Sequence, residues 1–306
     1  MSGGLVLAQL LNGLQYGVLL FLLAAGLTLV FGIMSFVNLA HGSLYMMGAY
    51  AAAVTQGLTG SFVLAVLAAM AVALLIGLLL EFVAVSRLYQ RDHLDHVLAT
   101  FGLILFFNEL VRIVWGSQPY FVQVPVALQG TVDLFGFSYP SYRFAIILVG
   151  LLVAVGSWWL INRTRIGMLI RAGSVNPKMV AALGVNIQWL NAMLFGVGAM
   201  LAGLAGAMAA PILSVQSGMG EPVLITTLVV IVIGGIGSVS GAFYAALIVG
   251  TVDTLGRAFL PIWLRLVSER SFADTAGPAL ASMLVYVLMA VVLAWRPQGL
   301  FPTKRG

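Results

Sequence analysis

The stretch FVLAVLAAMAVALLIGLLLEFVAV, residues 62–85, decides the fold, because Glu81 is its single charged residue. It exceeds the about 20 apolar residues that a helix needs to cross a hydrocarbon core about 30 Å thick. A strand of a membrane barrel would instead alternate polar and apolar residues over about ten positions. The stretch therefore predicts a transmembrane helix.

The composition extends this prediction to the whole chain. Hydrophobic residues make up 62% of the 306 residues and charged residues only 8%, whereas a soluble domain carries about 25% charged residues. So few charges cannot cover a surface in water. We predict an all-α polytopic membrane protein, organised as one transmembrane domain over residues 1–306.

The N-terminus, the charge and the cysteine content exclude other classes. No basic segment precedes the first apolar run, so we expect that run to stay in the membrane and not to be cleaved as a signal peptide. The net charge of +5 does not indicate nucleic-acid binding, since the basic residues sit singly at the ends of apolar runs. The chain has no cysteine, which excludes disulfides and thiol chemistry.

Eight to nine membrane segments are expected, some of them broken or short. They are Leu5–Phe31, Phe36–Leu58, Phe62–Val85, Leu94–Trp115, Arg143–Ile161, Gln188–Leu213, Val223–Gly234, Gly241–Leu260 and Ala276–Trp295.

Two of these segments are irregular. Phe36–Leu58 opens with polar and small residues, and Val223–Gly234 is only about 18 Å long as a helix, too short to cross. Interrupted helices at membrane depth survive where protein or a water-filled cavity satisfies the backbone, and paired ones point to a transport path. The alternatives are a polar helix start at the interface and close helix packing at the glycines. The predicted path residues are Asn38, His41, Gly42, Ser43, Gly234, Gly235, Gly237, Ser238 and Gly241.

Arginine and lysine predict the orientation, since they are enriched on the cytoplasmic side. They gather in three places: Arg87 and Arg91; Arg163, Arg165, Arg171 and Lys178; and Arg296, Lys304 and Arg305. Residues 116–142 and Pro261–Thr275 then form outer loops, and the N-terminus is outside. In the first outer loop, FVQVPV, a turn at Gly130 and TVDLFGF predict a small hairpin.

The basic loop RTRIGMLIRAGSVNPKMVAALG, residues 163–184, contains a helix of its own. Asn176 suits an N-cap, Pro177 the first helical position and Gly184 the end. The helix is expected to present Met179, Val180 and Leu183 on one side. It either docks on a partner outside the bilayer or lies on the lipid headgroups as an ordinary connection.

Charged residues inside or beside the spans have local explanations. Glu109 with Arg112, and Asp253 with Arg257, have spacings that pair charges on one helix face. In RDHLDH, His93 and His96 with Asp92 and Asp95 could suggest a metal site, but a polar connection at a helix start explains them better. No metal and no cofactor are predicted.

Four segments carry a resemblance to a known family: NLAHGSLYMMGAY (38–50), RTRIGMLIRAGSVNPKMVAALGVN (163–186), GGIGSVSGAFYAALIVG (234–250) and RPQGLF (296–301). Together, in this order over essentially the whole chain, they resemble the LivH-type permeases. These are membrane subunits of high-affinity branched-chain amino-acid ABC importers, with a type II importer-like permease fold.

The resemblance implies that loop 162–187 is a cytoplasmic coupling loop that docks into a cleft on an ATPase subunit. It also implies a partner permease of LivM type, two ATPase chains, a soluble substrate-binding protein and a place in the bacterial cytoplasmic membrane. The family's close relatives take up urea, short amides and other small solutes, so the solute stays open. The coupling residues that it implies are Arg171, Ala172, Asn176, Pro177, Met179, Val180, Leu183 and Gly184.

The rival functions are an ion-coupled secondary carrier, a passive channel for a small neutral solute and an intramembrane enzyme. No unpaired acid stands out for a carrier, a channel does not need a basic docking loop, and no catalytic motif is present. GGIGSVSG also lacks the lysine of a phosphate-binding loop. We therefore expect a transport subunit, with ATP hydrolysis on separate chains.

Overall fold

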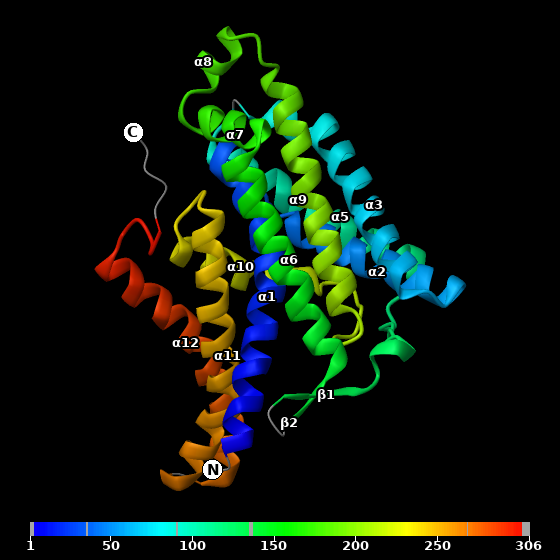
Figure 1. Cartoon of the computed structure of the whole chain (residues 1–306), viewed down its shortest axis with the longest axis vertical. Coiled ribbons are helices and arrows are strands. Elements are labelled where there is room, and N and C mark those ends of the chain that lie inside the picture. Colours follow the sequence, from blue (N-terminus) through cyan, green and yellow to red (C-terminus); the bar gives the residue numbers. More distant parts are fainter. Residues whose placement is uncertain (1–2, 35, 90, 135–136, 268, 302–306) are drawn as a thin grey trace.

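A computed structural model describes residues 3–34, 36–89, 91–134, 137–267 and 269–301. This part of the chain is helical apart from one small hairpin (Figure 1). The first half holds α1 (Gly3–Met34), α2 (His41–Thr59), α3 (Phe62–Leu80), a π-helical turn (Glu81–Val85), α4 (Ser86–Leu88) and α5 (His93–Trp115). A 3-10 turn (Val126–Leu128), β1 (Thr131–Leu134), β2 (Phe137–Pro140), α6 (Ser141–Arg163), α7 (Arg165–Val175) and α8 (Pro177–Ala182) follow. The remainder is α9 (Ile187–Ala209), α10 (Gly220–Gly234), α11 (Val239–Val267) and α12 (Arg270–Trp295).

The predicted class is confirmed, and each of the nine expected segments corresponds to a helix. Seven helices in the described residues are long and apolar enough to cross a membrane: α1, α3 with its π-helical extension, α5, α6, α9, α11 and α12. Helix α10 has only 15 residues, as its short apolar run predicts. Helix α2 has 19 residues and buries all of the first ten, so it lies inside the bundle.

Helices α1 and α9 form the centre of the bundle. In each, 78% of the most apolar window is buried within the chain, whereas the value for α6 is 17%. Figure 1 shows α1 between α6 and α11. Glycines permit the closest approaches: a Cβ on Gly26 would lie 2.5 Å from the Gly198 carbonyl oxygen of α9. The central helices are therefore packed backbone against backbone.

Helices α2 and α10 both begin inside the bundle, at a mutual contact. A Cβ on Gly42 would lie 2.7 Å from the Gly220 carbonyl oxygen, so the first turns of the two helices touch. The chain reaches these starts through residues 36–40 and 210–219, which are not α-helical. Both segments are thus interrupted spans whose helical part begins inside the bundle, and the positive ends of two helix dipoles meet there.

The segment Pro261–Thr275, expected as an outer loop, is mostly helical, so the loop is wrong, while its position outside stays a prediction. Helix α11 continues through Pro261 to Val267, and α12 already starts at Arg270. Two interactions hold these extensions together. Arg265 Nη2 lies 2.6 Å from Asp274 Oδ1, and a Cβ on Gly277 would lie 2.7 Å from the Pro261 ring, so the absent side chain makes room for the proline.

The outer hairpin is formed in part by other residues than the sequence predicts. Strands β1 and β2 pair antiparallel, with Thr131 opposite Pro140, and their turn at 135–136 lies outside the described residues. FVQVPV forms no strand with them: its end enters the 3-10 turn, and Pro125 has no amide hydrogen to donate to a ladder. Tyr139 and Arg143 both donate to Asn12 Oδ1, at 3.2 and 2.5 Å, and fasten the hairpin to α1.

The hairpin and helices α7 and α8 lie at opposite ends of the molecule, and the chain starts at the hairpin end (Figure 1). Two of the basic connections share the other end: residues 34, 86, 89, 173 and 177 line one cavity there. This grouping fits the predicted cytoplasmic side. Lys304 and Arg305 lie outside the described residues.

Candidate coupling and translocation sites

The helix predicted in the basic loop is confirmed as α8. Asn176 Oδ1 accepts the Met179 backbone N–H at 3.0 Å, as an N-cap does, and Pro177 is the first helical residue. Gly184 follows the helix with φ +86°, a left-handed conformation that favours glycine. A second helix, α7, precedes it, where only a loop was predicted: its N-cap is Thr164, whose hydroxyl accepts the Gly167 N–H at 3.1 Å.

The apolar side of α8 is smaller than predicted. Met179 and Leu183, one turn apart, are 60% and 78% exposed. Val180 is only 5% exposed, so placing it with them is wrong: one residue along a helix turns the side chain by about 100°, here towards the bundle. Val175 at the end of α7 adds a third exposed apolar side chain.

Four other proposed coupling residues are exposed as well. Arg171, Ala172, Asn176 and Pro177 are all exposed, and an Arg171 N–H donates to the Ile161 carbonyl at the end of α6. Their role in coupling remains a prediction.

Helix α7 is packed onto the centre of the bundle. Ile170 of α7 is buried with Leu190 and Leu194 of α9, and Met34 at the end of α1 packs against them. A force applied at α8 therefore reaches α9 and α1 through a close-packed contact.

The first group of predicted path residues is buried. Asn38, His41, Gly42 and Ser43 lie at the start of α2, and all four are buried. Within the described residues, Asn38 Nδ2 and His41 Nε2 have no hydrogen-bond partner. Buried polar atoms are normally satisfied, so this helix start is a polar point within an apolar core.

The second group forms the turn between α10 and α11. A Cβ on Gly234 would lie 2.5 Å from the Gly241 carbonyl carbon, so these two glycines are in packing contact. Gly235 and Gly237 adopt positive φ, and Ser238 Oγ accepts the Gly241 N–H at 3.0 Å. The tail fastens this turn: the Leu300 and Phe301 N–H groups donate to the carbonyls of residues 233 and 234.

The structure does not bring the two predicted groups together. The first lies at the start of α10, through the contact of Gly42 with Gly220, and the second lies at its end. The 14 residue steps of α10 separate them by about 21 Å. The role of both groups as path residues remains a prediction, with one group at mid-depth and one at the end that carries α7 and α8.

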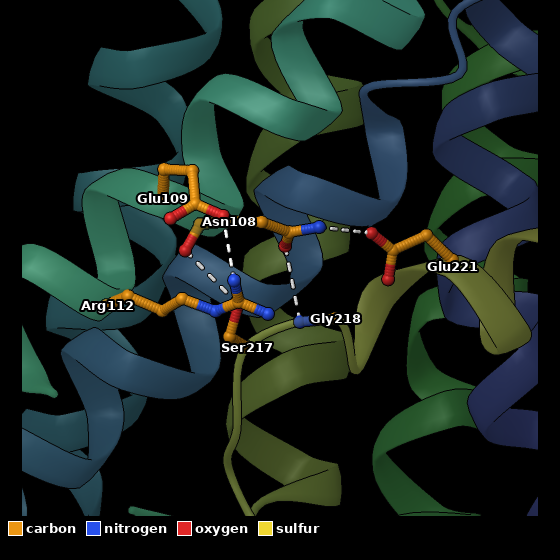
Figure 2. Close-up of polar contacts among 6 residues, drawn as sticks. All are labelled: Asn108, Glu109, Arg112, Ser217, Gly218 and Glu221. Atoms are coloured by element: carbon orange, nitrogen blue, oxygen red, sulfur yellow. Dashed lines mark hydrogen bonds and ion pairs between the residues drawn. The ribbon is translucent and has the colours of Figure 1, made fainter. Parts of the chain in front are cut away.

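A polar cluster that the sequence does not predict joins α5 to α10 and the non-helical residues in front of it (Figure 2). Asn108 Nδ2 donates to Glu221 Oε1 at 2.6 Å, and the Gly218 N–H donates to Asn108 Oδ1 at 3.2 Å. Ser217 Oγ donates to the Asn108 carbonyl at 3.1 Å. One asparagine thus holds two residues of the segment that leads into α10 and one residue of its first turn.

The cluster lies at membrane depth. Asn108 is seven residues before the end of α5 at Trp115, which is about 10 Å along the helix. Glu221 is in the first turn of α10, where the helix dipole favours a negative charge. One feature of the sequence indicates a carboxylate at this depth: the run Val223–Gly234 is too short to cross the bilayer. A helix of this length has to begin inside the bilayer, and the carboxylate of Glu221 that flanks it then lies there too.

The predicted charge pairs are confirmed. Glu109 and Arg112 pair at 2.8 Å beside Asn108, with side chains 63% and 55% exposed, and Asp253 and Arg257 also pair at 2.8 Å. Charged side chains inside a membrane span face a protein interior or a water-filled cavity, not lipid. The face of α5 with Glu109, and the start of α10 with Glu221, therefore form the candidate surface for a partner subunit or a solute path.

The histidine connection has a structural explanation. His96 Nε2 lies 2.8 Å from the Leu88 carbonyl, and its ring packs against Phe36 at a centroid distance of 4.6 Å. In the described part of the chain, no group of three or more metal-ligating side chains occurs.

These features define the class: an all-α, multi-pass membrane protein with two interrupted spans, whose helices α2 and α10 begin inside the bundle. Residues 9–293 match a family model described as branched-chain amino acid transport system, permease component. The chain belongs to this family and is a membrane-spanning permease subunit of a transport system.

Curated relatives cover nearly the whole chain. It is 31% identical to the high-affinity branched-chain amino acid transport system permease protein BraD of Pseudomonas aeruginosa, over 96% of this chain and 95% of the relative. It is 28% identical to LivH of Escherichia coli, over 95% and 96%, and 29% identical to LivM of Escherichia coli, over 93% and 68%. No solved structure matches the chain significantly.

Proposed function

We propose that this permease is the LivH-type membrane subunit of an ABC importer for branched-chain amino acids, in the bacterial cytoplasmic membrane. It works with a LivM-type partner permease, two ATPase chains and a soluble substrate-binding protein, and it does not hydrolyse ATP itself. The observation that carries the proposal is the exposed apolar surface of α8 on a basic loop. Relatives of the same length, which are named as permeases of branched-chain amino-acid transport, support the proposal together with this surface.

The coupling route runs from α8 to the outer half of the bundle. An ATPase that grips Met179 and Leu183 moves α7, whose Ile170 is packed on Leu190 and Leu194 of α9. Helix α9 leads directly into the non-helical residues 210–219, and Asn108 ties the end of that segment to α5. Motion at the ATPase thereby shifts α5 and the start of α10 as one unit.

The partner permease covers the polar face of α5 and α10. Glu109 and Arg112 are more than half exposed, and the carboxylate of Glu221 accepts a hydrogen bond from Asn108, the residue next to Glu109. Contact with lipid would cost these charged groups a large free energy of desolvation. We therefore place a second permease subunit beside them, with a water-filled path between the two subunits. Solute passes there at low affinity, because a site that binds tightly would trap its cargo, and the binding protein supplies selectivity.

The test is reconstitution with the proposed partners. The chain is co-expressed with the partner permease and the ATPase chains encoded beside it, and the complex is purified. We expect ATP hydrolysis that the leucine-loaded binding protein stimulates, and no hydrolysis by the isolated chain. Hydrolysis by the clean, isolated chain, or a failure of any ATPase to co-purify, would contradict the proposal.

A further inference from the structure

A cavity of about 230 Å³ lies where α7 meets the α10–α11 turn. Helices α1, α6, α7 and α11 all contribute to its walls, at the end of the molecule that carries α7 and α8. Its polar side chains are Thr28, Asn162, Arg171, Ser174, Ser238 and Ser240. None of the described residues that line it is acidic.

The cavity is built for an anion. The start of α11 lines it, and a helix N-terminus offers free backbone N–H groups and a positive dipole end. Ser238 Oγ already accepts the Gly241 N–H, so its own hydrogen is left to donate. Arg171 uses one guanidinium N–H on the Ile161 carbonyl and has further donors left.

A buried hydroxyl supplies an independent sign of a ligand. Thr28 is fully buried, and within the described residues its Oγ1 has no hydrogen-bond partner. A threonine in a helix usually satisfies its hydroxyl on the carbonyl three or four residues earlier, and Thr28 lines the cavity instead. An unsatisfied donor at the base of a donor-rich cavity indicates that an acceptor belongs there.

An apolar groove continues from this cavity. It has a volume of about 430 Å³ and shares Trp158, Val239 and Ser240 with the polar cavity. It runs over α1 between α6 and α11, which flank α1 in Figure 1. Its other lining side chains are all apolar or aromatic: Phe21, Leu151, Ala154, Val155, Phe243 and Tyr244.

We propose that the joined cavity and groove bind an anionic phospholipid. Its phosphate lies between Arg171 and the N-terminus of α11, and one acyl chain lies along the groove between α6 and α11. A free phosphate ion would satisfy the same donors but would leave the apolar groove empty. The lipid binds in the leaflet that meets α7, and it tethers α7 to α11 beside the coupling surface.

Native mass spectrometry of the purified full-length chain, titrated with phosphatidylglycerol, tests the site. The wild type is expected to bind one phosphatidylglycerol more tightly than it binds phosphatidylcholine. Arg171→Gln removes a charge-assisted bond and should weaken this binding about tenfold, while Arg171→Lys keeps the charge and should retain most of it. Arg165→Gln is the matched control, since Arg165 is on the same helix but does not line the cavity.

A second variant tests the groove without touching the anion site. Ala154→Trp fills it from α6 and should also weaken phosphatidylglycerol binding, while excess inorganic phosphate should not displace the lipid. Equal binding by Arg171→Gln and Arg165→Gln would overturn the proposal. So would unchanged lipid binding by Ala154→Trp together with displacement by phosphate, because the site would then hold a headgroup anion alone.

Discussion

Asn108→Leu should loosen residues 210–219, the non-helical segment in front of α10. The change removes two side-chain hydrogen bonds, one to the Glu221 carboxylate at 2.6 Å and one from the Gly218 N–H at 3.2 Å. A bond to a charged group contributes about 1.5–3 kcal/mol and a bond to a backbone amide about 0.5–1.5 kcal/mol. Because both are partly exposed in the single chain, we take the lower end, about 2 kcal/mol.

A loss of about 2 kcal/mol changes an opening equilibrium by roughly 30-fold. The assay is hydrogen–deuterium exchange of the purified chain, read over residues 210–220. Exchange there should be faster by about that factor in Asn108→Leu, while the backbone of α9 stays protected. Glu221→Gln keeps an acceptor for Asn108 but loses the charge, so its effect should be intermediate.

The double change Asn108→Leu with Glu221→Met removes both partners and should cost less than the sum of the two single changes. Wild-type exchange over residues 210–220 in Asn108→Leu would refute the reasoning. The asparagine would then be a passive neighbour of the segment and not its fastening.

Three further predictions use other parts of the chain. Leu183→Asp places a charge on the exposed apolar side of α8. If this side binds in an ATPase cleft, the buried, unpaired carboxylate costs about 3–5 kcal/mol. Co-purification of the ATPase should then fail, while membrane insertion stays normal. Gly48→Ala should destabilise the chain by about 1–3 kcal/mol, because its Cβ would lie 2.4 Å from the backbone of α9, whereas Gly57→Ala in the same helix meets nothing within 4 Å and should show no loss in a thermal unfolding assay. A cysteine at Ser238, which lines a cavity, should react with small water-soluble thiol reagents, and one at the buried Ser43 should stay protected in the isolated chain; the reverse pattern would contradict the structure.

The sequence predicts most of this fold, because membrane helices are recognisable from the length and the hydropathy of their apolar runs. Each of the nine expected segments contains a helix, and the shortness of α10 followed directly from the length of the twelve-residue run Val223–Gly234. The N-cap at Asn176 and the left-handed Gly184 were also predictable, because capping chemistry is local.

Properties that depend on which residues face each other were not predictable. The burial of Val180 depends on how α8 lies on the bundle. The hairpin pairs 131–134 with 137–140 and not with FVQVPV, because Tyr120 instead exchanges backbone bonds with Val215, almost a hundred residues away. The contact of Asn108 with Glu221 could not be predicted either, because it joins two helices that are far apart in the sequence.

The central claim is that this chain forms the path of an ATP-driven importer for branched-chain amino acids. The most direct test is uptake of labelled leucine by proteoliposomes that hold the whole complex and the binding protein, with the proton gradient collapsed by an ionophore. The account predicts uptake that requires ATP on the ATPase side and persists without the gradient. Uptake that stops with the gradient while ATP remains would contradict it and would indicate a secondary carrier.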